Sequence, residues 1–130
     1  MAEPFVFIGT HRLKEGKLAD FEKSFAELVN VVEANEPQMI AFNGYANEEG
    51  TEVAVVQVHP DAASMELHMQ VVHEHITHAY EELLEETTSI QVFGVLSASA
   101  KEMMLQLAGA GVPLAVKSQP LGGFTRSAAS

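Results

Sequence analysis

Apolar residues recur along the chain with two different periods, and each change of period marks a predicted element. In the segment 5–13, FVFIGTHRL, both alternating sets of side chains are largely apolar, which is typical of a strand covered on both faces. Residues 18–33 carry apolar side chains every three or four positions, and this spacing predicts an amphipathic helix. Pro37 ends the helical pattern, because proline lacks a backbone N–H and its ring clashes with the preceding turn.

The middle of the chain predicts a hairpin followed by a second helix. Residues 40–46 and 53–58 have the composition of strands, and the polar segment NEEGTE between them suits a hairpin turn. The segment HPDAAS then breaks the strand pattern. A helix is predicted to follow it and to run to about Thr87, with Asp61 or Ser64 capping its first turn.

Residues 90–96, IQVFGVL, add a fourth strand, so the order is β-α-β-β-α-β, the ferredoxin-like pattern of α+β proteins with an antiparallel sheet. Two helices cover one face of such a sheet, although its strands are apolar on both. We therefore expect a second copy to cover the other face in a homodimer, a dimeric α/β barrel. Residues 1–96 form the predicted domain, and residues 97–130 a helix and strand extension that packs on the same domain or the partner subunit. In this extension Phe124 is expected to pack and Arg126 to meet a carboxylate.

Composition restricts the partners of this protein. The formal net charge is −11, from 18 acidic and 7 scattered basic residues. Nucleic acids require clustered Lys and Arg, and anionic membranes repel an acidic surface, so neither partner is expected. No apolar run approaches the ~20 residues of a membrane span, and the first residues lack the features of a signal peptide. The sequence has no cysteine, which excludes disulfides and thiol chemistry and favours a cytoplasmic protein.

The segment HMQVVHEHITH, residues 68–78, contains four of the six histidines. On a helix with ~100° per residue, His68 and His75 point in nearly the same direction at the border of the apolar stripe, whereas His73 and His78 point elsewhere. The two-histidine spacing of zinc proteases is absent, so no metal site is predicted. The alternative is that His75 and His78, three residues apart, share an ion with a third ligand from a strand, such as His59 or His11. We predict that His68 and His75 are catalytic, because an imidazole at an apolar border suits proton transfer. The alternative is that they fill the border and bond to backbone or carboxylate groups.

Several polar side chains interrupt the apolar strands. Buried polar groups need partners, so these residues either pair with one another or contact a ligand. Alternation places Asn43 and Tyr45 on a common face, but one sequence does not define which face is the inner one. We predict that Asn43 and Tyr45 bind the substrate. The interruptions are Thr10, His11, Asn43, Tyr45, Gln57, His59 and Gln91.

Three stretches together resemble the antibiotic-biosynthesis monooxygenase (ABM) family of the dimeric α/β-barrel superfamily. They are FVFIGTHRLKEGKLADFEKSFAELV, VAVVQVHPDAASMELHMQVVHEHITHAYEEL and IQVFGV, and the similarity covers residues 4–96. The resemblance implies a homodimer with a ligand cavity inside each subunit. It also implies an enzyme that oxidises aromatic or quinol-type compounds with dioxygen and without a bound metal or flavin, with His68 and His75 bordering the cavity.

Haem-degrading relatives of this family use an asparagine on the first strand, a tryptophan on the second helix and a histidine ten residues later. His78 stands ten residues after His68 and matches that ligand-binding histidine. The chain contains no tryptophan, however, and offers Gly9 and Thr10 where the asparagine is required. These departures argue against haem degradation.

Two functions follow from the sequence. The first is a cofactor-independent monooxygenase acting on a small, apolar, aromatic or quinol-like compound. The second is a non-catalytic ligand-binding or structural homodimer whose interior is filled by side chains such as Phe42 and Met65. Fold alone does not choose between them, because one scaffold serves many functions.

Overall fold

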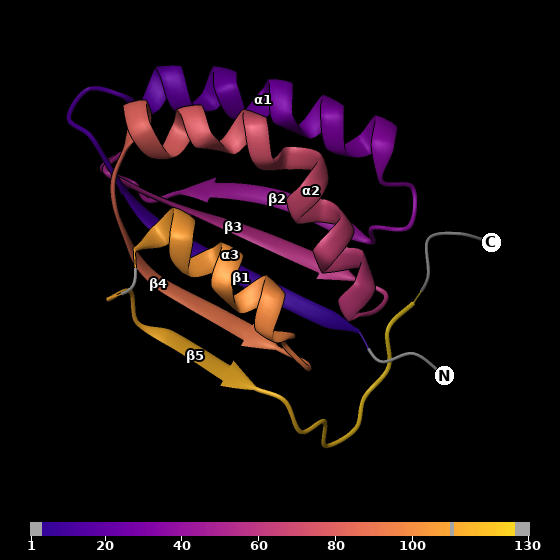
Figure 1. Cartoon of the computed structure of the whole chain (residues 1–130). Helices are drawn as coiled ribbons and strands as arrows, with labels where there is room; N and C mark the ends of the chain where they lie inside the picture. Colours follow the sequence, from indigo (N-terminus) through magenta and orange to yellow (C-terminus); the bar gives the residue numbers. More distant parts are fainter. Residues whose placement is uncertain (1–3, 110, 127–130) are drawn as a thin grey trace.

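Five strands form one sheet in the order β2-β3-β1-β4-β5, and the helices pack on one of its faces (Figure 1). The computed structural model describes residues 4–109 and 111–126. Within these ranges no helix is both long and apolar enough to cross a membrane. The elements are β1 (Phe5–Leu13), α1 (Leu18–Asn35), β2 (Ala41–Ala46), β3 (Glu52–His59), α2 (Ala62–His78), the π-helical turn η1 (Ala79–Leu83), β4 (Leu84–Phe93), α3 (Ala98–Ala108) and β5 (Leu114–Lys117).

The ferredoxin-like order β-α-β-β-α-β is confirmed, and the first strand has the predicted bounds. β1 lies between β3 and β4 and pairs antiparallel with both, while β2 pairs antiparallel with β3 at the edge. β5 pairs with β4 in parallel, because α3 carries the chain back along the sheet before β5 begins. The four ferredoxin-like strands form the predicted antiparallel sheet, and β5 of the extension makes the whole sheet mixed and leaves it open at both edges.

The second helix is shorter than the sequence predicts. α2 ends at His78, η1 adds one wide turn, and β4 begins at Leu84 instead of near residue 90. The extra strand residues are extended because they pair with β1, with Leu84 opposite Leu13 and Thr87 opposite His11. This pairing across the chain outweighs the local helical preference of the neighbouring glutamates.

The strand register separates an inner face from an outer face. Phe5, Phe7 and His11 of β1 point toward the helices and are buried, whereas the alternate residues Val6 and Ile8 point away. In the described ranges no helix covers the outer face (Figure 1). The core on the inner face consists of Phe5, Phe7, Met65, Met69, Ile90, Val92, Ala100 and Met104.

The C-terminal extension divides into a packed helix and an exposed tail. Ser97 caps the N-terminus of α3, where its hydroxyl accepts a hydrogen bond from the Ala100 N–H, and α3 buries Met104 in the core. Phe124 is 80% exposed and stacks only with Arg126, so the prediction that Phe124 packs is wrong within the single chain. The tail leaves the sheet edge after β5 and runs outside the layer of helices (Figure 1). Residues 127–130 of the predicted extension lie outside the described residues.

Candidate functional site

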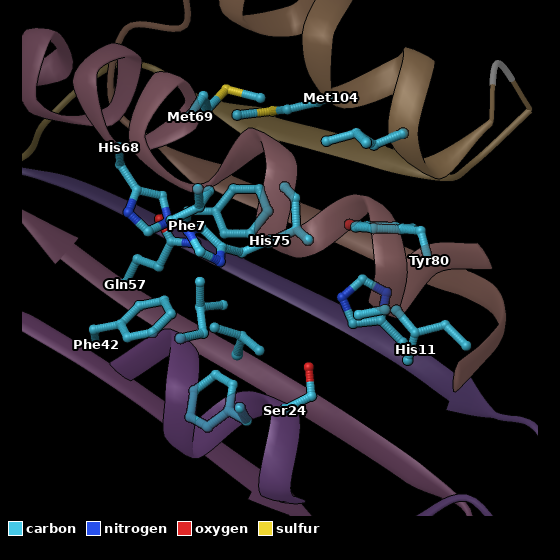
Figure 2. A pocket seen from close by; sticks show the side chains of 18 of the residues that line it. Phe7, His11, Ser24, Phe42, Gln57, His68, Met69, His75, Tyr80 and Met104 are labelled. Atoms are coloured by element: carbon cyan, nitrogen blue, oxygen red, sulfur yellow. The ribbon is translucent and has the colours of Figure 1, made fainter. Parts of the chain in front are cut away.

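A cavity lies between the inner face of the sheet and the three helices. It holds about 90 Å³ of space, and its walls are mostly aromatic and aliphatic. α3 closes one side with Met104 and Leu107, so the extension forms part of the cavity wall. The polar side chains that line the cavity are His11, Ser24, Gln57, His68, His75 and Tyr80 (Figure 2).

A buried carboxylate holds His68 at the wall of this cavity. His68 Nδ1 lies 2.9 Å and 3.1 Å from the two carboxylate oxygens of Glu36, which follows the last turn of α1. The Glu36 side chain is wholly inaccessible to solvent and that of His68 nearly so. Glu36 therefore fixes the orientation of the imidazole and the position of its proton.

The other ring nitrogen of His68 is available to a ligand. Nε2 has no hydrogen-bond partner among the described residues. None of their side-chain nitrogen or oxygen atoms is both completely buried and unpaired, so Nε2 is not completely buried. Because His68 lines the cavity, Nε2 borders its interior. With Nδ1–H donating to Glu36, the Nε2 lone pair can accept a proton, and the carboxylate then balances the positive charge of the imidazolium.

A chain of hydrogen bonds orients Gln57 beside His68. The amide of Gln38 donates to the Ser64 hydroxyl over 3.2 Å, and Ser64 Oγ lies 2.7 Å from His59 Nδ1. His59 Nε2 lies 3.0 Å from Gln57 Oε1. An amide oxygen can only accept, so His59 carries its proton on Nε2 and receives the Ser64 O–H at Nδ1. The Gln57 NH₂ group is left facing the cavity as a donor.

A second polar cluster lies at the other end of the cavity (Figure 2). His11 Nδ1 is 2.9 Å from Thr87 Oγ1, and the Tyr80 ring packs edge-on against the His11 ring. Burial raises the pKa of Tyr80 to about 12, so the phenol keeps its proton at neutral pH.

The buried histidines predict an acid-sensitive fold. Burial lowers the pKa of His11 from 6.5 to about 4, and burial together with the nearby His68 lowers that of His59 to about 4. Below pH 6.5 His11 and His59 bind protons in the unfolded chain but remain neutral in the folded chain. The free energy of unfolding therefore falls as the pH drops from 6.5 toward 4. We expect a loss of about 2 kcal/mol for each of the two histidines between pH 7 and pH 5, measured by urea unfolding.

The variant His11→Gln tests this assignment, because glutamine can bond to Thr87 but does not titrate. It should lose about 2 kcal/mol less than the wild type over the same pH interval. The exposed His73 serves as the control, and His73→Gln should leave the pH dependence unchanged. An identical pH dependence in His11→Gln and the wild type would contradict the buried neutral state.

The structure brings the two predicted catalytic histidines to one cavity but gives them different surroundings. His68 is 3% exposed and paired, whereas His75 is exposed at the cavity wall and has no hydrogen-bond partner among the described residues. His78 is exposed at the end of α2 and does not line the cavity. Only His68 combines burial, a carboxylate partner and a nitrogen open to the cavity.

Asn43 and Tyr45, predicted to bind substrate, lie on the outer face of the sheet. Phe42 of β2 is opposite Gln57 and lines the cavity, so its neighbours in the alternation point the other way. Tyr45 is 61% exposed. Neither residue contacts the cavity of its own chain. Gln57 and His11 line the cavity instead and supply polar groups of the kind predicted for Asn43 and Tyr45.

Sequence reasoning missed Glu36, Tyr80 and Thr87. Glu36 lies between the helix and Pro37, where a carboxylate is usually a solvated helix end, and no local pattern marks it. Thr87 was assigned to the second helix. Tyr80 has a usable signal, because it follows Ile76 by four residues and therefore brings a hydroxyl to the apolar stripe.

Metal binding has no support in the part of the chain that the structure describes, where no three His, Cys, Asp or Glu side chains are grouped to hold an ion. The three buried histidines, His11, His59 and His68, instead bond to Glu36, Ser64, Gln57 and Thr87.

No family profile matches this sequence, and no curated protein is significantly similar to it. Solved structures are similar in fold. MupZ from Pseudomonas fluorescens is 18% identical, with a TM-score of 0.69 over 95% of this chain and 91% of that one. A candidate antibiotic biosynthesis monooxygenase from Bacteroides thetaiotaomicron is 14% identical, with a TM-score of 0.58 over 65% of this chain and 83% of that one. Another from Chloroflexus aurantiacus is 13% identical, with a TM-score of 0.57 over 74% of this chain and 94% of that one.

At such identities the similarity concerns the fold. The alignment with MupZ covers nearly the whole chain, including α3 and β5. The alignments with the two monooxygenase candidates cover about two thirds to three quarters of it. The chain therefore has the fold of the antibiotic biosynthesis monooxygenases, an α+β ferredoxin-like fold with an open sheet.

Proposed function

We propose that this protein is a cofactor-independent monooxygenase that oxidises a small hydroxylated aromatic compound in the cavity. The observation that carries the proposal is the Glu36–His68 pair, which places an oriented base at the wall of an otherwise apolar cavity. The fold shared with monooxygenase candidates supports the same reaction class.

The proposed reaction converts a phenol and dioxygen into a quinone and water. His68 Nε2 takes the hydroxyl proton, and the resulting phenolate gives one electron to dioxygen. The two radicals combine at the ring carbon opposite the phenolate oxygen, and the peroxide formed there receives the proton back from His68. Loss of water, which carries away the hydrogen of that ring carbon, leaves the second carbonyl. One oxygen atom enters the product, the other enters water, and the substrate supplies all the electrons.

Each step uses a group that the cavity provides. The charge of the imidazolium is balanced by Glu36, and the Gln57 NH₂ group can donate to the phenolate oxygen. The apolar walls favour a flat ring and leave little water to compete for these polar groups. Because the substrate is the electron source, the base is the essential protein group.

Oxygen uptake with α-naphthol tests the proposal. The purified protein should consume one dioxygen for each naphthoquinone formed, and labelled dioxygen should place one labelled atom in the product. Catalase should have no effect, because the reaction releases water and not hydrogen peroxide. If the naphthol binds and no oxygen is consumed, the alternative of a non-catalytic ligand-binding homodimer is favoured.

We also infer that the functional unit is a homodimer joined through the outer face of the sheet. That face exposes a continuous apolar surface over the central strands β1 and β3, and a second copy offers the same surface in return. Its half-buried apolar residues are Val6, Ile8, Ala54, Val56, Val58 and Phe93.

Light scattering tests the dimer. The wild type should have twice the 14.1 kDa mass of one chain at micromolar concentration. Val56→Asp, at the centre of the outer face, should give the monomer mass, because a buried unpaired carboxylate opposes association. Ala26→Asp, on the exposed side of α1, is the matched control and should remain dimeric. A wild-type mass of one chain would exclude this assembly.

A further inference from the structure

The cluster of His11, Thr87 and Tyr80 has hydrogen-bonding capacity that the proposed reaction does not use. The three side chains come from β1, β4 and η1. His11 and Tyr80 lie at the end of the cavity away from His68 and Gln57 (Figure 2), and Thr87 is hydrogen-bonded to His11. Along the sheet, His11 follows Phe7 by four residues, and Phe7 is opposite Gln57. The backbone positions of the two polar ends are thus ~13 Å apart, with the side chains extending inward between them.

The cluster has more hydrogen-bond donors than the bonds within it use. Neutral His11 brings one N–H, and Thr87 and Tyr80 bring one O–H each. The His11–Thr87 bond uses one of these three hydrogens, whichever way it points. At least one hydrogen remains without a partner among the described residues, and His11 and Tyr80, which line the cavity, are placed to direct it inward.

The surroundings select an uncharged acceptor for this spare donor. No Lys or Arg lines the cavity among the described residues, so an anion at this end would be unpaired and costly to bury. A carbonyl oxygen accepts a hydrogen bond without bringing a charge. The phenolate of the proposed reaction, in contrast, forms at the other end, where protonated His68 balances it.

Gly9 lets the Phe7 and His11 rings lie close against the sheet between the two ends. A Cβ atom on this residue would lie 3.1 Å from the Phe7 ring and 3.2 Å from His11 Nε2. Both contacts are tighter than ordinary van der Waals distances, so a side chain at position 9 would push the Phe7 ring or the imidazole into the cavity. The glycine therefore preserves the space between the clusters.

We propose that the His11–Thr87–Tyr80 cluster binds a carbonyl oxygen of the same ligand whose hydroxyl faces His68. The ligand class is then an aromatic compound with an ionisable hydroxyl at one end and a carbonyl at the other. This inference rests on the proposed function for the placement of the hydroxyl, and it adds the second recognition group and the orientation of the ring.

Binding of two matched probes to the full chain, measured by calorimetry, tests the inference. Para-hydroxyacetophenone carries the hydroxyl and the carbonyl, and para-ethylphenol has the same shape without the carbonyl oxygen. The wild type should bind the first about tenfold more tightly than the second. Thr87→Val and Tyr80→Phe should each reduce this ratio toward one and leave the affinity for para-ethylphenol within about twofold.

Two further variants separate recognition from folding. Thr87→Ser retains the hydroxyl and should retain the tenfold preference. Glu36→Gln alters the opposite end and should change the affinity for both probes by the same factor. Equal affinity of the wild type for the two probes, an unchanged ratio in both Thr87→Val and Tyr80→Phe, or no binding of either probe would overturn the inference.

The test also distinguishes this inference from the proposed function. Turnover of α-naphthol without a preference for the carbonyl probe would leave the monooxygenase intact and remove the carbonyl site. A preference for the carbonyl probe without oxygen uptake would retain the carbonyl site and remove the proposed oxygenation.

Discussion

Replacement of His68 by Gln is expected to lower the rate of α-naphthol oxidation by about 10²–10⁴-fold, the usual contribution of a positioned general base. Glutamine approximates the volume of histidine and can still bond to Glu36, but it cannot take a proton from the substrate. The loss should therefore appear in kcat, with the affinity for the naphthol changed much less. The rate of oxygen uptake at saturating substrate is the measurement.

His75→Gln is the matched control, because His75 borders the same cavity from the same helix but is exposed and unpaired among the described residues. It should retain activity within about tenfold of the wild type. The variant His68→Ala adds a second readout, since free imidazole can occupy the vacated space and should restore part of the rate. Full activity of His68→Gln, or an equal loss in the two histidine variants, would contradict the role of His68 as the base.

Removal of one partner from the Glu36–His68 pair is expected to destabilise the fold by about 3–5 kcal/mol. Both side chains are almost completely buried, so either single replacement leaves a polar or charged group without its partner. Such a loss is a large share of the ~5–15 kcal/mol by which domains of this size are stable. Glu36→Leu and His68→Leu, each measured by urea unfolding at pH 7, should show this loss as a lower midpoint with a similar slope.

The double variant Glu36→Leu/His68→Leu should be more stable than either single variant, because it removes the pair and leaves nothing unpaired. Glu36→Gln is the conservative control, since its amide oxygen still accepts the Nδ1–H bond, and its cost should be near 1 kcal/mol. If the two single losses simply add in the double variant, the residues are not coupled in solution as they are in the structure.

The element order was predictable because it depends on local periodicity. β1 matches its predicted range, and the apolar spacing of 18–33 identifies α1 to within two residues. The boundary between α2 and β4 was not predictable in the same way. The segment from Leu84 to Thr87 is compatible with either structure locally, and its strand state depends on pairing with β1, more than seventy residues earlier in the chain.

The candidate site was predictable only in part. The histidine-rich helix directed attention to His68 and His75, and the polar interruptions of the strands included His11, Gln57 and His59. Selecting among them required knowledge of which strand face meets the helices. A shift of one residue reverses every side chain, and the choice of Asn43 and Tyr45 over Phe42 and Gln57 was wrong for that reason.

The sequence by itself determined the order of strands and helices, the apolar character of both sheet faces and the histidine-bearing helix, because these features depend on neighbours a few positions apart. Only the tertiary structure decided that Glu36 meets His68 across 32 residues and that Thr87 meets His11 across 76. A buried polar group requires a hydrogen-bonding partner. The packing of distant segments determines which partner it meets, and local spacing carries no information about that packing.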